Sequence, residues 1–166
     1  MKKTLKLLSI LFVTILISCG GKEEKKKESF SYEKKETTTE KSKSETKTPA
    51  SKRVDLSTKG FGTITSIELS AEIDQAMVTH GADVFKKMCT ACHRPDKKFI
   101  GPAPTGILER RTPEWIMNMI LNPEEMVQKD PLAKELLIEF NGSPMANQNL
   151  TQEEARAVLE YFRTLK

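Results

Sequence analysis

Hydrophobic residues are distributed very unevenly along the 166-residue chain. An apolar run from Leu7 to Ile17 follows three lysines and is interrupted only by Ser9 and Thr14. From Lys22 to Lys59 the chain consists mainly of Lys, Glu, Ser and Thr. Apolar residues at helical spacing begin only at Ile73. The pattern therefore predicts a short leader, a polar segment and one folded domain.

The folded part carries clear helix-start signals. A capping residue followed by proline and acidic or apolar residues occurs at Thr112-Pro113, Asn122-Pro123 and Asp130-Pro131. Leu150-Thr151-Gln152-Glu153-Glu154 is a capping box with a hydrophobic residue in front of it. Helices are expected before Cys89, after Pro113, after Pro123, over 131–140 and over 152–165. Thr63–Leu69 is the single candidate strand. The fold class is therefore all-α, with a helical domain of about 100 residues.

The two N-terminal segments are interpreted as a signal and a tether. The eleven-residue apolar run is too short to span a bilayer but suits the core of a signal peptide, assigned to residues 1–18. The polar segment cannot bury enough surface to offset its chain entropy, so a disordered tether is expected over 19–66. The domain is then expected over 67–166.

Charge separates these regions further. Residues 61–166 contain 12 basic and 15 acidic side chains, a net charge of −3, so the positive charge of the whole chain belongs to the N-terminal third. A mildly acidic domain argues against nucleic acid as its ligand.

The candidate chemistry lies at Cys89-Thr90-Ala91-Cys92-His93, a C-x-x-C-H pattern typical of c-type haem attachment. Each thiol adds to one haem vinyl group, and the adjacent imidazole becomes an axial ligand of the iron. A thioredoxin-like site would need a preceding strand, and a zinc site would need two further ligands where only His80 remains. A disulfide between Cys89 and Cys92 is the remaining alternative.

A second axial ligand is sought among the methionines. Met77 and Met88 are expected on the apolar face of the first helix, and three others in helical patterns are expected to fill the core: Met117, Met119 and Met126. Met145 differs because it lies in a turn-rich loop and follows Pro144, which restricts the backbone. Met145 is therefore the predicted sixth ligand, with His80 as its rival.

From Ile73 to Lys166 the sequence resembles the class I cytochromes c, the small monohaem bacterial kind. The resemblance implies that Gly81 and Phe85 lie where the first helix crosses the last, with Tyr161 or Phe162 as the facing aromatic. It also implies that the Pro102 carbonyl accepts the N–H of the His93 imidazole and so orients it. Trp115 resembles the family's haem-packing tryptophan, although it could equally be a core aromatic.

Leu16-Ile17-Ser18-Cys19 resembles a bacterial lipobox, which implies cleavage before Cys19 and lipid attachment to that residue. An ordinary signal peptide with an incidental cysteine is the alternative. Lys22-Glu23-Glu24 resembles a surface-export signal of some Gram-negative lipoproteins, so a position on the cell surface is also considered.

The expected function is that of a lipid-anchored electron carrier with one haem c, facing the periplasm, rather than an enzyme. The resemblance implies membrane-bound respiratory donor and acceptor proteins as partners. Basic residues near the haem motif could steer an acidic partner or simply be solvated: Lys86, Lys87, Arg94, Lys97 and Lys98. The alternatives are a gas or redox sensor, and an accessory subunit of a terminal oxidase or nitrogen-oxide reductase.

Overall fold

The computed structural model describes residues 48–166, so the predicted signal peptide, Cys19 and the first part of the tether lie outside the described residues. The described part is helical, and no strand occurs within 48–166. One isolated parallel bridge joins Asp55 to Arg111. The prediction of an all-α domain is confirmed, whereas the candidate strand at Thr63–Leu69 is wrong because that segment pairs with no neighbouring strand.

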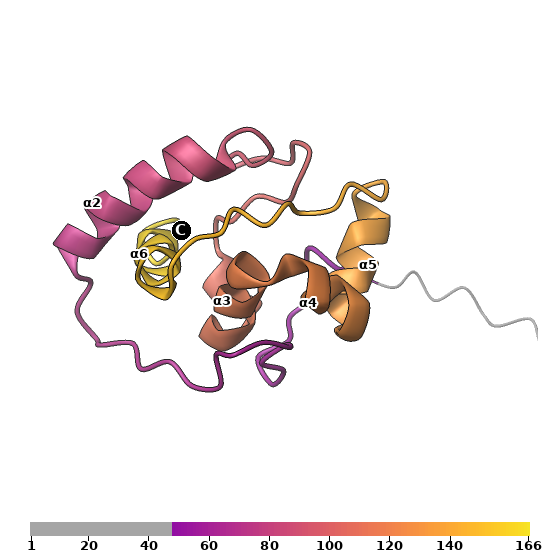
Figure 1. The fold of residues 1–166 in the computed structure, drawn as a ribbon, viewed down its shortest axis with the longest axis horizontal. Helices are drawn as coiled ribbons and strands as arrows, with labels where there is room; N and C mark the ends of the chain where they lie inside the picture. The colour runs from indigo at the N-terminus through magenta and orange to yellow at the C-terminus, as the bar shows by residue number, and fades with distance from the viewer. Residues whose placement is uncertain (1–47) are drawn as a thin grey trace, which may run out of the picture. The chain divides into compact units, whose positions relative to one another are not determined.

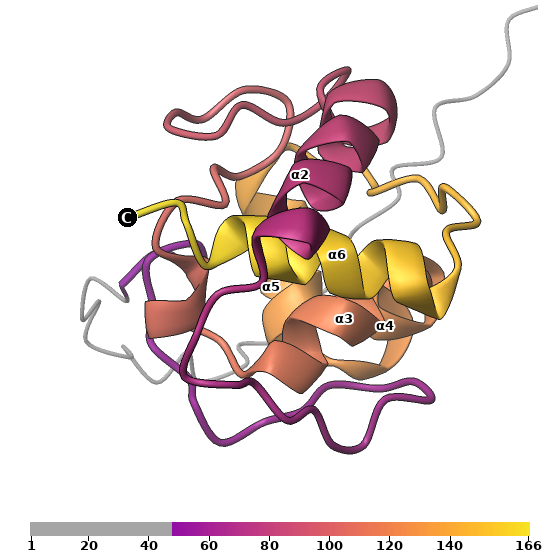
Figure 2. The same ribbon diagram turned by 90° about the vertical axis from the view of Figure 1, so that its left-hand side faces the viewer.

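Helices α2 (Gln75–Val84) and α6 (Gln152–Phe162) cross each other, as Figure 2 shows. Gly81 lies at the crossing, where a Cβ atom would stand only 1.9 Å from the carbonyl oxygen of Ala157. The Phe85 ring packs nearby against Tyr161 and Phe162, with centroids 5.5 and 5.7 Å away. The absence of a side chain at Gly81 therefore permits the close approach, and the aromatic residues fill the space beside it.

Three short helices follow one another in the middle of the domain: α3 (Pro113–Leu121), α4 (Pro123–Lys129) and α5 (Pro131–Glu139). Figure 1 shows them on the side of α6 that faces away from α2. Helix α3 packs against α6 and α4, and α4 packs against α5. Buried side chains of these helices and of α6 form the core, among them Ile116, Met117, Met126 and Leu159.

The predicted helix starts are largely confirmed. Thr112 and Asp130 accept hydrogen bonds from the first-turn amides of Trp115 and Ala133. Thr151 forms the complete capping box with Glu154. Asn122 precedes α4 without capping it, because its side chain donates to Glu125 instead. Helix α5 ends one residue earlier than expected and α6 three residues earlier, at Glu139 and Phe162.

The first helix differs from the expected one in its exposed face. Met77 and Met88 are 37% and 38% exposed, so their expected burial on an apolar face is wrong. The helix begins at Gln75, where Asp74 caps it, and changes into a π-helical turn over Phe85–Cys89. Only Gly81 and Val84 of α2 are buried, because contact with one crossing helix covers a narrow part of its surface.

The segment 48–66 is ordered on the domain, which corrects the prediction that the disordered tether extends to residue 66. Ala50 and Ile64 are buried. The amide group of Asn118 binds both polar backbone atoms of Ile64, accepting from its N–H at 3.0 Å and donating to its carbonyl at 2.9 Å. The guanidinium of Arg111 donates to two carbonyls farther upstream, those of Ala50 and Arg53. Side chains of the domain thus form hydrogen bonds with the backbone of this segment, which has little apolar surface of its own.

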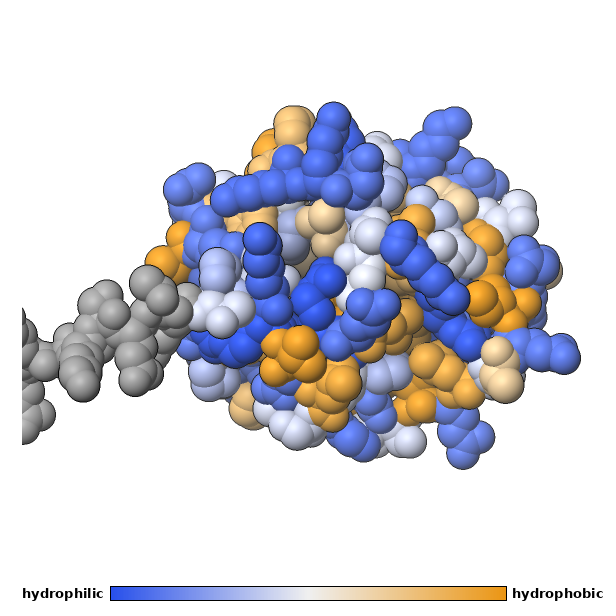
Figure 3. Space-filling model, turned by 180° about the vertical axis from the view of Figure 1, so that it is seen from behind, coloured by the Kyte–Doolittle hydropathy of each residue, from blue (hydrophilic) through white to orange (hydrophobic). Residues whose placement is uncertain are grey.

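On the face behind that of Figure 1, hydrophilic side chains alternate with separate apolar patches (Figure 3). Five apolar residues of segments 54–61 and 99–100 contribute to the exposed surface: Val54, Leu56, Phe61, Phe99 and Ile100. None of the helices in the described part is long and apolar enough to cross a membrane.

Candidate haem site

The cysteine pair lies on a tight turn at the end of the π-helical segment. The backbone N–H groups of Cys92 and His93 both donate to the carbonyl of Cys89, at 3.1 and 2.9 Å. Cys89 is half-buried and Cys92 is exposed, and both thiols are free. Burial raises the pKa of the Cys89 thiol to about 11. The turn thus presents two free thiols and an imidazole within five residues.

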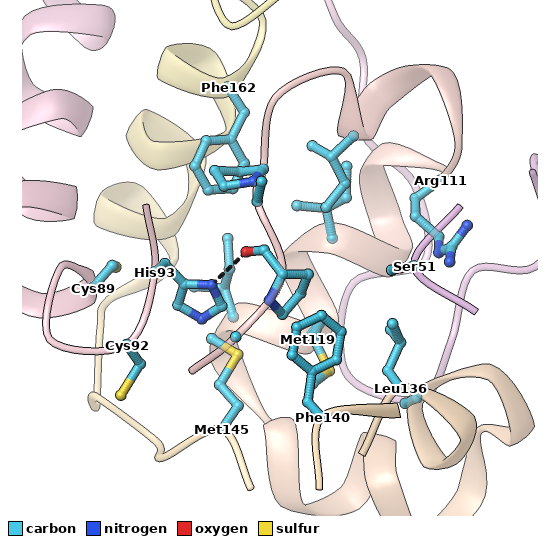
Figure 4. Close-up of a pocket in the computed structure, with 18 of the residues that line it drawn as sticks. Ser51, Cys89, Cys92, His93, Arg111, Met119, Leu136, Phe140, Met145 and Phe162 are labelled. Carbon is cyan, nitrogen blue, oxygen red and sulfur yellow. Dashed lines mark hydrogen bonds between the residues drawn. The ribbon is translucent and has the colours of Figure 1, made fainter. Parts of the chain in front are cut away.

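His93 is held by a hydrogen bond between its Nδ1 and the Pro102 carbonyl at 2.8 Å (Figure 4). A carbonyl oxygen only accepts, so Nδ1 carries the proton and Nε2 keeps its lone pair for a metal. Gly101 leaves the room for this arrangement, since a Cβ there would lie 2.4 Å from Cε1 of the imidazole. The hydrogen bond implied by the resemblance is therefore present. Its effect on an iron-bound imidazole stays a prediction.

A large apolar cavity extends from the cysteine pair into the domain. The central loop, the three short helices and α6 all line it, through residues such as Ile107, Ile116, Leu136, Phe140 and Phe162. Cys89 and Cys92 lie at one end, while Ser51 and Arg111 lie at the other (Figure 4). Such a lining suits a bulky, largely apolar cofactor attached at one end.

Met145 lines this cavity from the loop that follows α5. The chain reverses at Asn141 and Gly142, whose φ values of 59° and 72° end the helix. Figure 4 draws Met145 beside His93. His80 instead lines a separate, more polar pocket with Asp83 and Glu154. The structure therefore brings Met145 to the cavity that His93 lines and does not bring His80 there.

The methionines that were expected to fill the core differ in their surroundings. Met117 and Met126 are fully buried in the core, as expected. Met119 was also expected to fill the core, but it lines the cavity and is half-buried. The cavity therefore contains two thioether groups, and Met119 becomes a rival of Met145 that sequence reasoning had set aside.

Trp115 is 2% exposed and lines the cavity. Its indole Nε1 is the single buried polar side-chain atom of the described residues that has no hydrogen-bond partner. Such a donor is costly to bury unless an acceptor is supplied. The carboxylates of haem are acceptors of this kind, and the lining of the cavity is mostly apolar, so the residues present fit a bound haem.

Sequence reasoning missed the basic end of the cavity. Arg110 and Arg111 both line it, together with Ser51. Arg111 is buried, and desolvation, followed by the like charge of Arg110, lowers its pKa. Its guanidinium lies 5.3 Å from the centroid of the Trp115 ring. The adjacent arginines before the Thr112 helix start are the available signal, but the burial of Arg111 involves Ala50 and Arg53, which lie in the segment that its composition assigns to the tether.

The basic residues near the haem motif have mixed surroundings. Arg94 stacks over the Phe99 ring at 4.2 Å and donates to the carbonyl of Thr90. The Nζ atom of Lys98 lies 4.6 Å from the centroid of the Phe140 ring, at the end of α5. Three further lysines are exposed: Lys86, Lys87 and Lys97. Within residues 48–166, no three His, Cys, Asp or Glu side chains are grouped to hold a metal ion.

Comparisons with known proteins agree on one family. The sequence model of the family described as Cytochrome c matches residues 78–166. A solved cytochrome c from Rhodothermus marinus is 43% identical with a TM-score of 0.61, covering 63% of this chain and 89% of that one. An engineered variant of it, Rma TDE, is 42% identical with a TM-score of 0.60, covering 63% and 90%. The variant has also been solved bound to a carbene intermediate.

No curated protein matched the chain. The family match covers more than half of the chain and includes Cys89, Cys92 and His93. It supports a role as a haem electron carrier. The chain therefore belongs to the cytochrome c family, as a class I c-type cytochrome whose cofactor is covalently bound haem c.

Proposed function

We propose that this protein is a lipid-anchored cytochrome that carries single electrons between respiratory partners in the cell envelope. The observation that carries the proposal is the joint placement of His93 and Met145 in one apolar cavity next to the cysteine pair. Histidine and methionine as the two axial ligands favour electron transfer, since neither position is left open to a substrate.

Each residue of the site has a separate role in holding the cofactor. When bound, haem supplies an iron that gains and loses one electron. Cys89 and Cys92 would form thioethers with it, and Nε2 of His93 and the sulfur of Met145 would ligate its iron. Pro102 holds the imidazole in its tautomer through the 2.8 Å hydrogen bond. Trp115 packs in the cavity and offers its unpaired Nε1 to a haem carboxylate.

The proposed interaction with membrane-bound partners depends on the charge near the haem motif and on a lipid at Cys19. The exposed lysines near the haem motif would steer an acidic partner over a small, transient interface. A lipid on Cys19 would keep the domain near membrane-bound donors and acceptors and so raise its effective concentration there.

Spectroscopy of the matured protein tests the electron-carrier proposal. We expect a six-coordinate low-spin ferric spectrum with the weak thioether–iron charge-transfer band, and a ferrous form that binds CO only slowly. Rapid CO binding by the untreated ferrous protein would contradict the proposal and favour a sensor.

A second experiment tests the respiratory part. Envelope membranes of the source cells should reoxidise the reduced protein, and the rate should fall as salt rises because the encounter is steered by charge. Reoxidation that needs no membranes would contradict respiratory partners. Stable copurification with one membrane complex would instead favour an accessory subunit.

A further inference from the structure

A short part of the N-terminal segment lies across the end of the cavity that faces away from the cysteines. We call residues 49–53 the strap. It is a single turn in which the N–H groups of Lys52 and Arg53 both donate to the Pro49 carbonyl, at 2.9 and 3.0 Å. Ala50 is buried and Ser51 lines the cavity.

Two carboxylates of helix α5 hold one side of the strap. Glu139 accepts from the backbone N–H of Ser51 at 2.8 Å and from its hydroxyl at 2.5 Å. Glu135, one turn earlier on the helix, forms an ion pair with Arg53. Both pairs are only partly exposed and reinforce each other because they fix the same turn.

Arg111 holds the other side of the strap and faces the cavity as well. Its two terminal nitrogens donate to the carbonyls of Ala50 and Arg53. The strap therefore joins α5 to the residues that precede α3, and it fixes a buried positive charge over the ring of Trp115, whose indole Nε1 has no partner.

The position of the strap matters because of the chemistry of haem. The two vinyl groups lie at the porphyrin edge opposite the two propionates. Thioethers to Cys89 and Cys92 therefore direct the propionates toward the end of the cavity where Arg111 and Ser51 lie (Figure 4). The strap covers this end, since Ala50 is buried and Ser51 lines the cavity.

We propose that the strap tunes the electron-transfer reaction: by covering the propionate end and fixing Arg111 there, it raises the reduction potential of the haem. Ferric haem carries one more positive charge than ferrous haem. Exclusion of water and a nearby cation both disfavour the ferric state. The residues that hold the strap in place are then positioning residues: Ser51, Arg53, Arg111, Glu135 and Glu139. The inference rests on haem c binding and not on the proposed partners.

The test releases the strap without touching the cavity. In the full, haem-loaded protein, Arg53→Ala/Glu139→Ala removes the ion pair with Glu135 and both hydrogen bonds from Ser51 to Glu139. Lys52→Ala/Glu124→Ala is the matched control, since it removes the same charges from exposed side chains of the strap and of α4. Amide hydrogen exchange of residues 51–53 reports release, and spectroelectrochemical titration reports the potential.

We expect the first variant to lose amide protection in the strap, to keep its low-spin spectrum, and to be up to about tenfold harder to reduce, a fall of about 59 mV for one electron. The control should change neither property. A released strap with an unchanged potential overturns the proposal, and so does a strap that stays protected. If the double variant fails to hold haem, Glu139→Gln, which keeps the Arg53 ion pair, is judged by the same two measurements.

Discussion

At the scale of single residues, the site depends on how one imidazole is held. The Pro102 carbonyl fixes the proton on Nδ1 of His93, and Gly101 provides the space in which the ring lies. The pattern C-x-x-C-H predicted the ligand, but the space around the ring could only be seen in the fold. The glycine is therefore as specific a requirement as the histidine.

Gly101→Ala tests this requirement. The new methyl group would lie 2.4 Å from Cε1 of His93 and must displace the ring. We expect a lower yield of haem-loaded protein and a partly high-spin ferric spectrum. Gly142→Ala is the control: its φ of 72° costs about 1–2 kcal/mol, but nothing lies within 4 Å, so its spectrum should be unchanged. Equal spectra for both variants would show that Gly101 has no special role.

Met145→Ala tests the assignment of the sixth ligand against the second thioether of the cavity. Loss of the ligand should lower the reduction potential and let the ferrous protein bind CO rapidly. Met119→Ala also shortens a cavity-lining methionine but should leave the CO-resistant, low-spin form intact. Potentiometry and CO titration of both variants show which methionine is the ligand. The reverse result would make Met119 the ligand.

At the scale of elements, the helices could be predicted and the segment before them could not. Thr112, Asp130 and Thr151 each accept from the amide three residues later, so their role can be predicted from neighbouring positions in the sequence. Segment 48–66 is held by Arg111 and Asn118, more than fifty residues away. Its local composition carries no sign of these distant partners, and this is why it was mistaken for tether.

The crossing of α2 and α6 yields a prediction of its own. In Gly81→Ala the methyl group would stand 1.9 Å from the Ala157 carbonyl oxygen, and this backbone atom cannot move aside as a flexible side chain could. We expect the helices to separate and the protein to lose about 3 kcal/mol or more of stability. Thr79→Ala, on an exposed part of the same helix, is the control and should change the denaturation midpoint little.

Glu160 of α6 joins this helix to the start of α2. It is fully buried, and it accepts from the Asp74 amide at 3.0 Å and from Arg156 and Arg163 at 2.6 and 2.5 Å. Burial alone would raise its pKa, but the hydrogen bonds from Arg156 and Asp74 and the two positive charges outweigh burial and lower it. Its stabilisation is therefore present above the ordinary pKa of 4.5 and is lost as the pH falls through the lower folded value.

Glu160→Gln should thus cost about 2–3 kcal/mol at pH 7, and the difference from the native protein should shrink below pH 4.5. Urea unfolding of the ferric protein between pH 7 and pH 3 measures both effects. Glu153→Gln, exposed on the same helix, should show neither. A cost that does not vary with pH would mean that the charge of Glu160 contributes nothing.

At the scale of the whole molecule, function could be inferred from five adjacent residues because haem attachment is a local chemical requirement. The cavity could not be inferred in the same way. It is assembled from residues between Ser51 and Phe162, and its basic end depends on a segment outside the matched region 78–166. Local motifs therefore predict the cofactor, while the environment that tunes it emerges only from the fold.

The proposed lipid on Cys19 can be tested on the whole molecule. Cys19 ends the apolar run and resembles a lipidation site, so the mature protein should begin there and carry acyl chains. The native protein should therefore enter the detergent phase on phase separation, and its mass should exceed that of polypeptide plus haem. Replacing residues 1–19 by a cleavable secretory signal without a cysteine should yield the same low-spin cytochrome in the aqueous phase, because attachment of the haem depends on Cys89 and Cys92 alone. A native protein of unmodified mass, or a replaced form that still partitions with detergent, would contradict a lipid on Cys19.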